Sequence, residues 1–311
     1  MGETITRGIG LGVIAYGLFC VHDAAVKWLV DTTPVWQILF FRSFLVLLGT
    51  LAIGRGPLLR RAVVSPLKRQ LLVRGVLMLV AWLCYYTASR SMPLAQLLTL
   101  YFAAPLIITL LAAPLLGEHV TRARWAAVVV GFVGVLFASD PFGVQANFAT
   151  LLVLIAAALW GYGIILMRRI ARRESSLLQM LFSNTLFLIV TGIASVVTWH
   201  TPTGSDLMLL LAVGGFGGLA QFSVFESARM VPASVLATVE YTALLWAFLL
   251  GYAIWGDIPV LSVFVGAGLI VVAGIMLVVT ERRAGEGTQN PSIVATRSST
   301  ASTSPGGDAS T

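Results

Sequence analysis

Five ionisable side chains lie inside long apolar stretches of this 311-residue sequence: His22, Asp23, Lys27, Arg42 and Glu240. A charged group at membrane depth is costly, so it normally faces a cavity or another charge. Asp23 and Lys27 are four residues apart and would share one helical face, where they can pair. We therefore expect Asp23 to form a compact network with Lys27 or Arg42. The alternative is that Asp23 or His22 carries a proton or binds a charged group of a ligand.

Glu240 is a lone carboxylate within the apolar stretch 233–255. Burial disfavours the charged form of such a group, so Glu240 is a candidate site for a proton or an amine. The alternative is that Glu240 is satisfied by Arg229 or by a backbone group. Arg229 also follows Glu226 by three residues, a spacing that favours a structural ion pair on one helix.

Aromatic side chains occupy the middle of several apolar stretches, where an interfacial belt does not explain them. Trp82, Trp160 and Trp246 are placed in this way, and Tyr86 and Tyr101 add polar tips at similar depths. A cavity lined by these rings would suit a planar or cationic solute, through stacking or cation–π contact. Packing or contact with lipid is the alternative for each of them.

One stretch, residues 207–228, combines Gln221 with four nearby glycines, Gly214, Gly215, Gly217 and Gly218. The Gln221 amide can hydrogen-bond to a polar solute or between helices. Small residues let helices approach closely in a membrane, so we expect close packing here. A hinge is the alternative interpretation of the glycines.

The amino-acid composition predicts that these ionisable and aromatic side chains lie in a membrane protein. Apolar residues make up 58% of the chain and charged residues 11%, against roughly 25% charged in an average soluble domain. A soluble fold could not cover its surface with so few charges, so the sequence predicts an all-α integral membrane protein in a lipid bilayer. The net charge of +7 comes from short clusters between apolar stretches, which argues against a nucleic-acid partner.

The apolar stretches predict ten transmembrane helices, at about 20 residues each. They cover Gly8–Val30, Val35–Ile53, Leu71–Ser91, Leu94–Leu116, Arg124–Ala138, Ala149–Met167, Leu177–Thr198, Leu207–Ala228, Ala233–Trp255 and Val260–Thr280. Residues 281–311 are rich in Ser, Thr, Gly and Pro, and we expect them to form a disordered tail.

Basic residues predict the orientation, because they concentrate in the cytoplasmic connections of membrane proteins. Most of the 20 Lys and Arg residues fall on the side that holds the N-terminus, and Arg74 is counted in that cytoplasmic group. Both termini should therefore be cytoplasmic, which agrees with an even number of spans.

The two halves of the chain resemble each other. Shifted by 139 residues, Arg90-Ser-Met-Pro93 falls on Arg229-Met-Val-Pro232, and Tyr101 falls on Glu240. Five spans per copy is an odd number, so the second copy must enter the membrane from the opposite side. We expect two inverted five-helix repeats, residues 1–140 and 141–280, with a binding site between them.

The ordered set of motifs resembles the ten-helix EamA-domain family of the drug/metabolite transporter superfamily. The likeness rests on Asp23-Ala-Ala-Val-Lys27-Trp28, Phe41-Arg42-Ser43, Pro93-Leu-Ala95, Gly117-Glu118 and Ser227-Ala-Arg-Met-Val-Pro232. Asp257 departs from it, since Glu is commoner at that place. The resemblance implies gradient-driven movement of a solute across a bacterial inner membrane.

The sequence is compatible with three classes of function. The leading hypothesis is a secondary transporter of a small polar organic metabolite, an amino acid or a vitamin such as riboflavin, with gates near Arg42 outside and near Glu240 inside. A membrane-embedded enzyme with His22 and Asp23 as an acid/base pair is the second class. A channel or sensor is the third. We find no Walker loop, dinucleotide turn or zinc spacing, and we expect no metal and no cofactor. Whether the chain forms a homodimer is left open.

Overall fold

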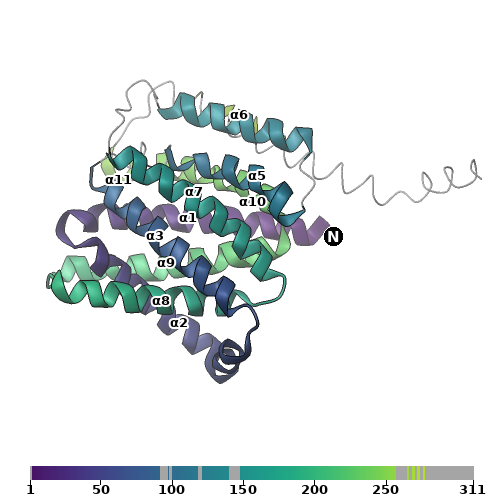
Figure 1. Ribbon diagram of the computed structural model, residues 1–311. Helices are drawn as coiled ribbons and strands as arrows, with labels where there is room; N and C mark the ends of the chain where they lie inside the picture. The colour runs from purple at the N-terminus through teal and green to yellow at the C-terminus, as the bar shows by residue number, and fades with distance from the viewer. Residues whose placement is uncertain are drawn as a thin grey trace, which may run out of the picture.

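The computed structural model describes residues 2–91, 97, 100–117, 121–139 and 148–256, and six isolated positions between 265 and 276. Its regular elements within these ranges are helices, drawn in Figure 1. The expected last span, Val260–Thr280, falls almost wholly outside the described residues, and the expected tail at 281–311 falls entirely outside them.

Ten helices are resolved in the described ranges, and they follow the apolar stretches. They are α1 (Gly2–Thr32), α2 (Val35–Val64), α3 (Lys68–Ser89), α5 (Ala103–Leu116), α6 (Arg122–Ser139), α7 (Phe148–Ala171), α8 (Ser176–Val197), α9 (Gly204–Met230), α10 (Ala233–Glu240) and α11 (Thr242–Trp255). Within the described ranges, seven spans are long and apolar enough to cross a membrane, the seventh running from Val235 to Ile254 across α10 and α11.

Local sequence explains where several helices begin. Pro34 and Pro232 precede α2 and α10, where the missing amide hydrogen of the ring does no harm. Thr203 and Asp206 form a capping box at the start of α9. The Thr32 hydroxyl, at the end of α1, donates a 3.1 Å hydrogen bond to Asp206, so this cap also joins α1 to α9.

The second helix differs from its expected length. The hydrophobic pattern predicts an end at Ile53, whereas α2 resumes beyond an irregular residue, Arg55 (φ 47°, ψ −152°), and runs to Val64. The Gly54-Arg-Gly-Pro57 sequence supplies the break, because glycine and proline both interrupt regular helices. In the distal part, Arg61 donates two 2.9 Å hydrogen bonds to Glu174, which lies between α7 and α8.

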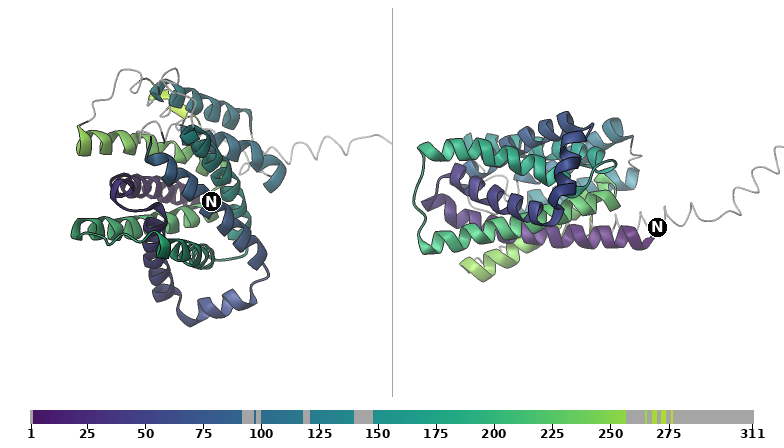
Figure 2. Two further views of the ribbon diagram at one scale, coloured as in Figure 1. Left: turned by 60° about the vertical axis from the view of Figure 1, so that its left-hand side comes forward. Right: turned by 90° about the horizontal axis from the view of Figure 1, so that it is seen from below.

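Most of the packing occurs between the two halves of the chain. Helix α1 packs on α9 and α11, α2 on α8 and α9, α3 on α7 and α8, and α5 on α7 and α10. Figures 1 and 2 show the resulting bundle, in which segments far apart in the sequence lie side by side. The largest apolar core therefore lies where the halves meet, with buried residues from both.

The expected ninth span is interrupted. Helix α10 ends at Glu240 and α11 begins at Thr242, with the Tyr241 amide bonded to the Thr238 carbonyl three residues back, in the tighter 3₁₀ pattern. In the first half, Tyr101 is helical and Phe102 lies in a turn before α5. The shift of 139 residues pairs Phe102 with Tyr241, and their ring centroids are 5.6 Å apart.

The glycines of α9 allow close packing, as expected. A Cβ atom on Gly217 would lie 2.7 Å from His22 Cδ2 and 3.2 Å from Arg42 Nε, whereas one on Gly215 would meet nothing within 4 Å. Gly217 therefore lets α9 approach α1 and α2.

We predict that Gly217→Ala lowers the stability of the protein, by about 1–3 kcal/mol, the usual cost of overpacking a core. The matched variant Gly215→Ala, on the same helix, should be neutral or slightly stabilising because alanine favours helix. Thermal unfolding of both variants in detergent measures the difference. Equal melting temperatures would show that the helices can separate without loss.

Candidate functional site

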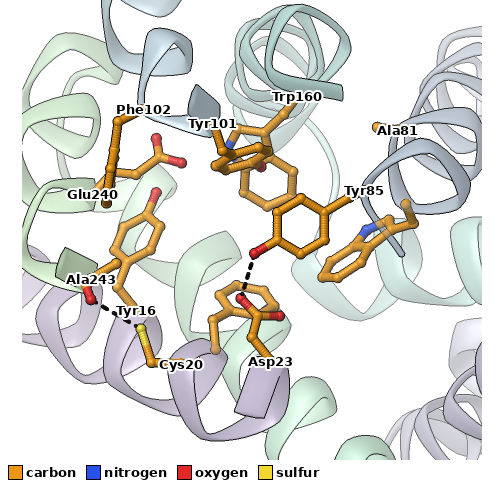
Figure 3. Close-up of a pocket in the computed structure, with 12 residues that line it drawn as sticks. Tyr16, Cys20, Asp23, Ala81, Tyr85, Tyr101, Phe102, Trp160, Glu240 and Ala243 are labelled. Carbon is orange, nitrogen blue, oxygen red and sulfur yellow. Dashed lines mark hydrogen bonds between the residues drawn. The ribbon is translucent and has the colours of Figure 1, made fainter. Parts of the chain in front are cut away.

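A cavity of about 570 Å³, counting the part that opens outward, lies between helices of both halves (Figure 3). Its walls come from α1, α3, α7, α10 and α11 and from the turn before α5. The lining residues are Tyr16, Phe19, Cys20, Asp23, Ala81, Trp82, Tyr85, Tyr101, Phe102, Trp160, Glu240 and Ala243. This first cavity is mainly apolar and aromatic, with two carboxylates.

The aromatic lining is a connected set of rings. Trp82 and Trp160 meet edge to face, with centroids 6.3 Å apart and planes at 89°. Tyr85 and Tyr101 meet at 5.2 Å, and Tyr101 and Trp160 at 6.2 Å. Such edge-to-face contacts are favourable and hold each ring in place, so the cavity offers a preorganised surface for a planar group.

The first carboxylate, Asp23, is held by neighbours that differ from those expected. Its Oδ1 lies 3.0 Å from His22 Nδ1, and the Tyr85 hydroxyl donates to Oδ2 at 3.2 Å. Among the described residues neither Lys27 nor Arg42 forms an ion pair with Asp23 within 4.0 Å. The expected compact network therefore includes His22 and Tyr85 at hydrogen-bond distance, and Arg42 only through the longer-range interaction of its charge with that of Asp23. Lys27 instead donates to the carbonyl of Ser89, at the end of α3.

His22 continues this network one layer behind the cavity. It is fully buried, and its Nε2 lies 2.9 Å from the hydroxyl of Tyr86, which is also fully buried. His22 also contacts the edge of Trp82, with ring centroids 5.5 Å apart. A chain of polar groups therefore runs from Asp23 through His22 to Tyr86 and supports the cavity from α1 and α3.

The second carboxylate, Glu240, is 1% exposed and ends α10 at the cavity. Neither of its oxygens has a hydrogen-bond partner within 3.5 Å among the described residues, but the Tyr16 hydroxyl and the Trp160 indole N–H lie beside it and are the donors that interact with it. Arg229 does not compensate it, since Arg229 forms the expected pair with Glu226 at 3.5 Å. Two carboxylate oxygens and two donors thus share one side of the cavity, without a hydrogen bond shorter than 3.5 Å between them and without a counter-charge for Glu240 among the described residues.

A second cavity, of about 360 Å³, adjoins the first. Phe19, Trp82 and Trp160 line both cavities and separate them. The other lining residues of the second cavity are Arg42, Arg74, Met78, Ser183, Asn184, Phe187, Gln221, Val224 and Phe225. The guanidinium carbon of Arg42 lies 4.5 Å from the centroid of the Trp82 ring, in a cation–π contact.

The structure brings together most, but not all, of the residues singled out in the sequence. Asp23, Tyr101 and Glu240 line the first cavity, Arg42 and Gln221 line the second, and Trp82 and Trp160 line both. His22 and Tyr86 lie behind them. Lys27 lines neither cavity, and neither does Trp246, which is 38% exposed and packs against Gly17.

Two contributions to the site escape the sequence analysis. Tyr16, Cys20 and Asp23 have the spacing i, i+4, i+7 and therefore share one face of α1, a signal that could have identified Tyr16 and Cys20. The side chain of Arg74, which the sequence groups with the cytoplasmic basic residues, is the second contribution. It is 2% exposed and lies two turns into α3, with its guanidinium in the second cavity.

Helices of membrane-spanning length that surround a polar-tipped, aromatic cavity define a multi-pass membrane protein with an internal cavity. In the part of the chain that the structure describes, no group of three His, Cys, Asp or Glu residues could hold a metal ion. The site therefore has to be understood from the carboxylates, arginines and rings described above.

The comparison with known proteins identifies the family. Residues 6–139 and 147–280 each match the EamA-like transporter family, and the chain belongs to that family. Its relatives include an S-adenosylmethionine uptake transporter of Rickettsia bellii, 25% identical over 91% of this chain and 97% of that protein. A pseudopaline exporter of Pseudomonas aeruginosa is 29% identical over 90% of this chain and 99% of that protein.

A riboflavin transporter of Vibrio cholerae is also similar, with 25% identity over 62% of this chain and 64% of that protein. A solved crystal structure covers 91% of the chain with a TM-score of 0.73 and 18% identity, which concerns the fold alone. The protein is therefore a member of a family of membrane transporters.

We predict that Asp23→Asn lowers transport at least tenfold, a change of about 1.4 kcal/mol. The amide loses the charge and one of the two acceptor atoms that His22 and Tyr85 use. Exchange of labelled metabolites in proteoliposomes measures the effect. Asp31→Asn, an exposed carboxylate on the same helix, is the control and should transport normally. Normal transport by Asp23→Asn would remove Asp23 from the mechanism.

Proposed function

We propose that this protein is a secondary transporter that moves a small polar organic metabolite by alternating access. The substrate carries a cationic or planar group, as an amino acid or a vitamin such as riboflavin does. The observation that carries the proposal is the buried Glu240 carboxylate, which lines an aromatic cavity and has no oppositely charged partner among the described residues.

A buried carboxylate without a counter-charge is strongly destabilising. Two kinds of partner relieve this cost in a transporter: a proton, or a cationic group of the substrate. Tyr16 and Trp160 place unsatisfied donors beside Glu240, so the same place can also hold a polar substrate atom. We infer that Glu240 binds the proton or the cationic group in turn, and that Asp23 completes the polar lining.

The names of the relatives support a planar substrate. S-adenosylmethionine and riboflavin both contain fused aromatic rings, which suit a cavity walled by Trp82, Tyr101 and Trp160. The relatives include an uptake transporter and an exporter, so their names favour neither direction of flux.

The proposed architecture is ten spans in two inverted repeats, residues 1–140 and 141–280, with residues 281–311 on the cytoplasmic side. Two matches to one family support it. The packing supports it as well. If α1, α2 and α3 correspond to α7, α8 and α9, the contact of α1 with α9 corresponds to that of α7 with α3. The contact of α2 with α9 likewise corresponds to that of α8 with α3. The interruptions at Phe102 and Tyr241 also correspond.

Alternating access would then open the cavity to either side of a bacterial inner membrane. We place the outer gate near Arg42 and the inner gate near Glu240. Because helices of opposite halves form most contacts, a rocking movement of one repeat against the other would act directly on the cavity walls.

We expect Glu240→Gln to lower the rate of exchange of cationic substrates at least tenfold, because the amide carries no charge. The assay is counterflow in proteoliposomes with a labelled panel of amino acids, riboflavin and S-adenosylmethionine. Glu226→Gln is the matched control, since Glu226 lies outside both cavities and pairs with Arg229. Counterflow that survives Glu240→Gln, or no counterflow by the folded wild type, contradicts the proposal.

The proposed orientation has its own test. Alkaline phosphatase fused after Thr311 should be inactive, because the enzyme needs the oxidising side of the membrane. A fusion after Thr201, between α8 and α9, should be active. The opposite pattern would place the termini outside.

A further inference from the structure

The second cavity contains two buried arginines that form no ion pair within 4.0 Å among the described residues. Arg42, on α2, is 1% exposed, and its Nε has no hydrogen-bond partner among the described residues. Arg74, on α3, is 2% exposed and donates only to neutral acceptors, the Gly163 carbonyl and the Ser183 hydroxyl, both at 3.3 Å. In the described ranges no carboxylate forms an ion pair with either guanidinium within 4.0 Å.

The remaining contacts of the two guanidinium groups are with rings. Arg42 lies over Trp82, and Arg74 lies 4.6 Å from the centroid of Phe225. Asp23, the carboxylate of the adjoining cavity, already accepts hydrogen bonds from His22 and Tyr85. The polar atoms that complete the lining are neutral: the Ser183 hydroxyl and the amides of Asn184 and Gln221. The second cavity is therefore basic, whereas the first is acidic.

This arrangement is costly as it stands. Burying one charge without a counter-charge is unfavourable, and two like charges that share one cavity add repulsion. An anion between them would supply the missing partner. The planar guanidinium fork matches the geometry of a carboxylate, so that chemistry fits best.

We propose that the second cavity binds the carboxylate of the transported molecule. This inference rests on the proposed function and narrows its substrate class to compounds that carry a carboxylate together with a cationic or planar part. Phe19, Trp82 and Trp160 form the boundary of both cavities, so one molecule can place its ring against these residues and its carboxylate beside the arginines. Arg42 and Arg74 then determine specificity, and Glu240 is left for the opposite charge.

The test compares pairs of probes that differ only in the carboxylate: tryptophan with tryptamine, and S-adenosylmethionine with its decarboxylated form. Binding to the purified full-length protein in detergent is measured by thermal shift and by titration calorimetry. We expect the carboxylated member of at least one pair to bind the wild type at least tenfold more tightly. In Arg74→Gln the two members should bind equally.

Arg74→Gln could lose binding only because Arg74 supports the fold. Ser183→Asp is therefore a second variant, which keeps Arg74 in place. The new carboxylate would lie beside Arg74 Nη1, which now bonds the Ser183 hydroxyl. The carboxylate introduced by Ser183→Asp should take the place of the bound anion. It should abolish the preference for carboxylated probes without lowering the melting temperature of the protein. Glu240→Gln, in contrast, should weaken tryptamine binding and leave the preference for the carboxylate intact.

The outcomes separate this inference from the proposed function. Equal binding of both members of every pair by the wild type overturns the carboxylate site, even if counterflow is present. Stabilisation by sodium chloride or phosphate to the same extent as by the carboxylated probes also overturns it, in favour of an inorganic ion. A carboxylate preference without any counterflow supports the site and contradicts transport by this mechanism.

Discussion

The cost of burying charge away from water is the constraint on which this site depends. Glu240, Arg42 and Arg74 are almost fully buried, and none of them forms an ion pair within 4.0 Å among the described residues. A protein selected for stability alone would pair such groups or replace them. Their clustering in one region is the reason why we propose partners from outside the chain, as protons or as charged parts of a solute.

Aromatic residues line the cavities beside these buried charges and provide the surface on which a solute could bind. Phe19, Trp82 and Trp160 line both cavities and lie between the acidic and the basic one. Their edge-to-face contacts leave ring faces available, and the cation–π contact with Trp82 partly compensates Arg42. Opposite charges on the two sides of an aromatic boundary suit a solute with separated charges.

Packing between the halves places this boundary at the centre of the molecule. Helices α1 and α3 contribute Asp23, Trp82 and Arg74, and the facing helices α7 and α10 contribute Trp160 and Glu240. The helix also breaks beside the cavity, between Glu240 and Thr242. A membrane tolerates such breaks where they line a cavity, because the released backbone groups can find partners there.

Apolar length and the types of charged residue within apolar stretches are local properties, so they were enough to predict the class of protein and the main candidate residues. The sequence identified Asp23, Arg42, Trp160 and Glu240 without any structure. The contacts and the burial of these residues became clear only from the tertiary structure. Asp23 forms hydrogen bonds with His22 and Tyr85, Trp246 lies outside the cavities, and Arg74 is buried. Helical spacing limits which groups of one helix can meet, but contacts between helices from opposite halves depend on rotation and depth, which no local pattern encodes.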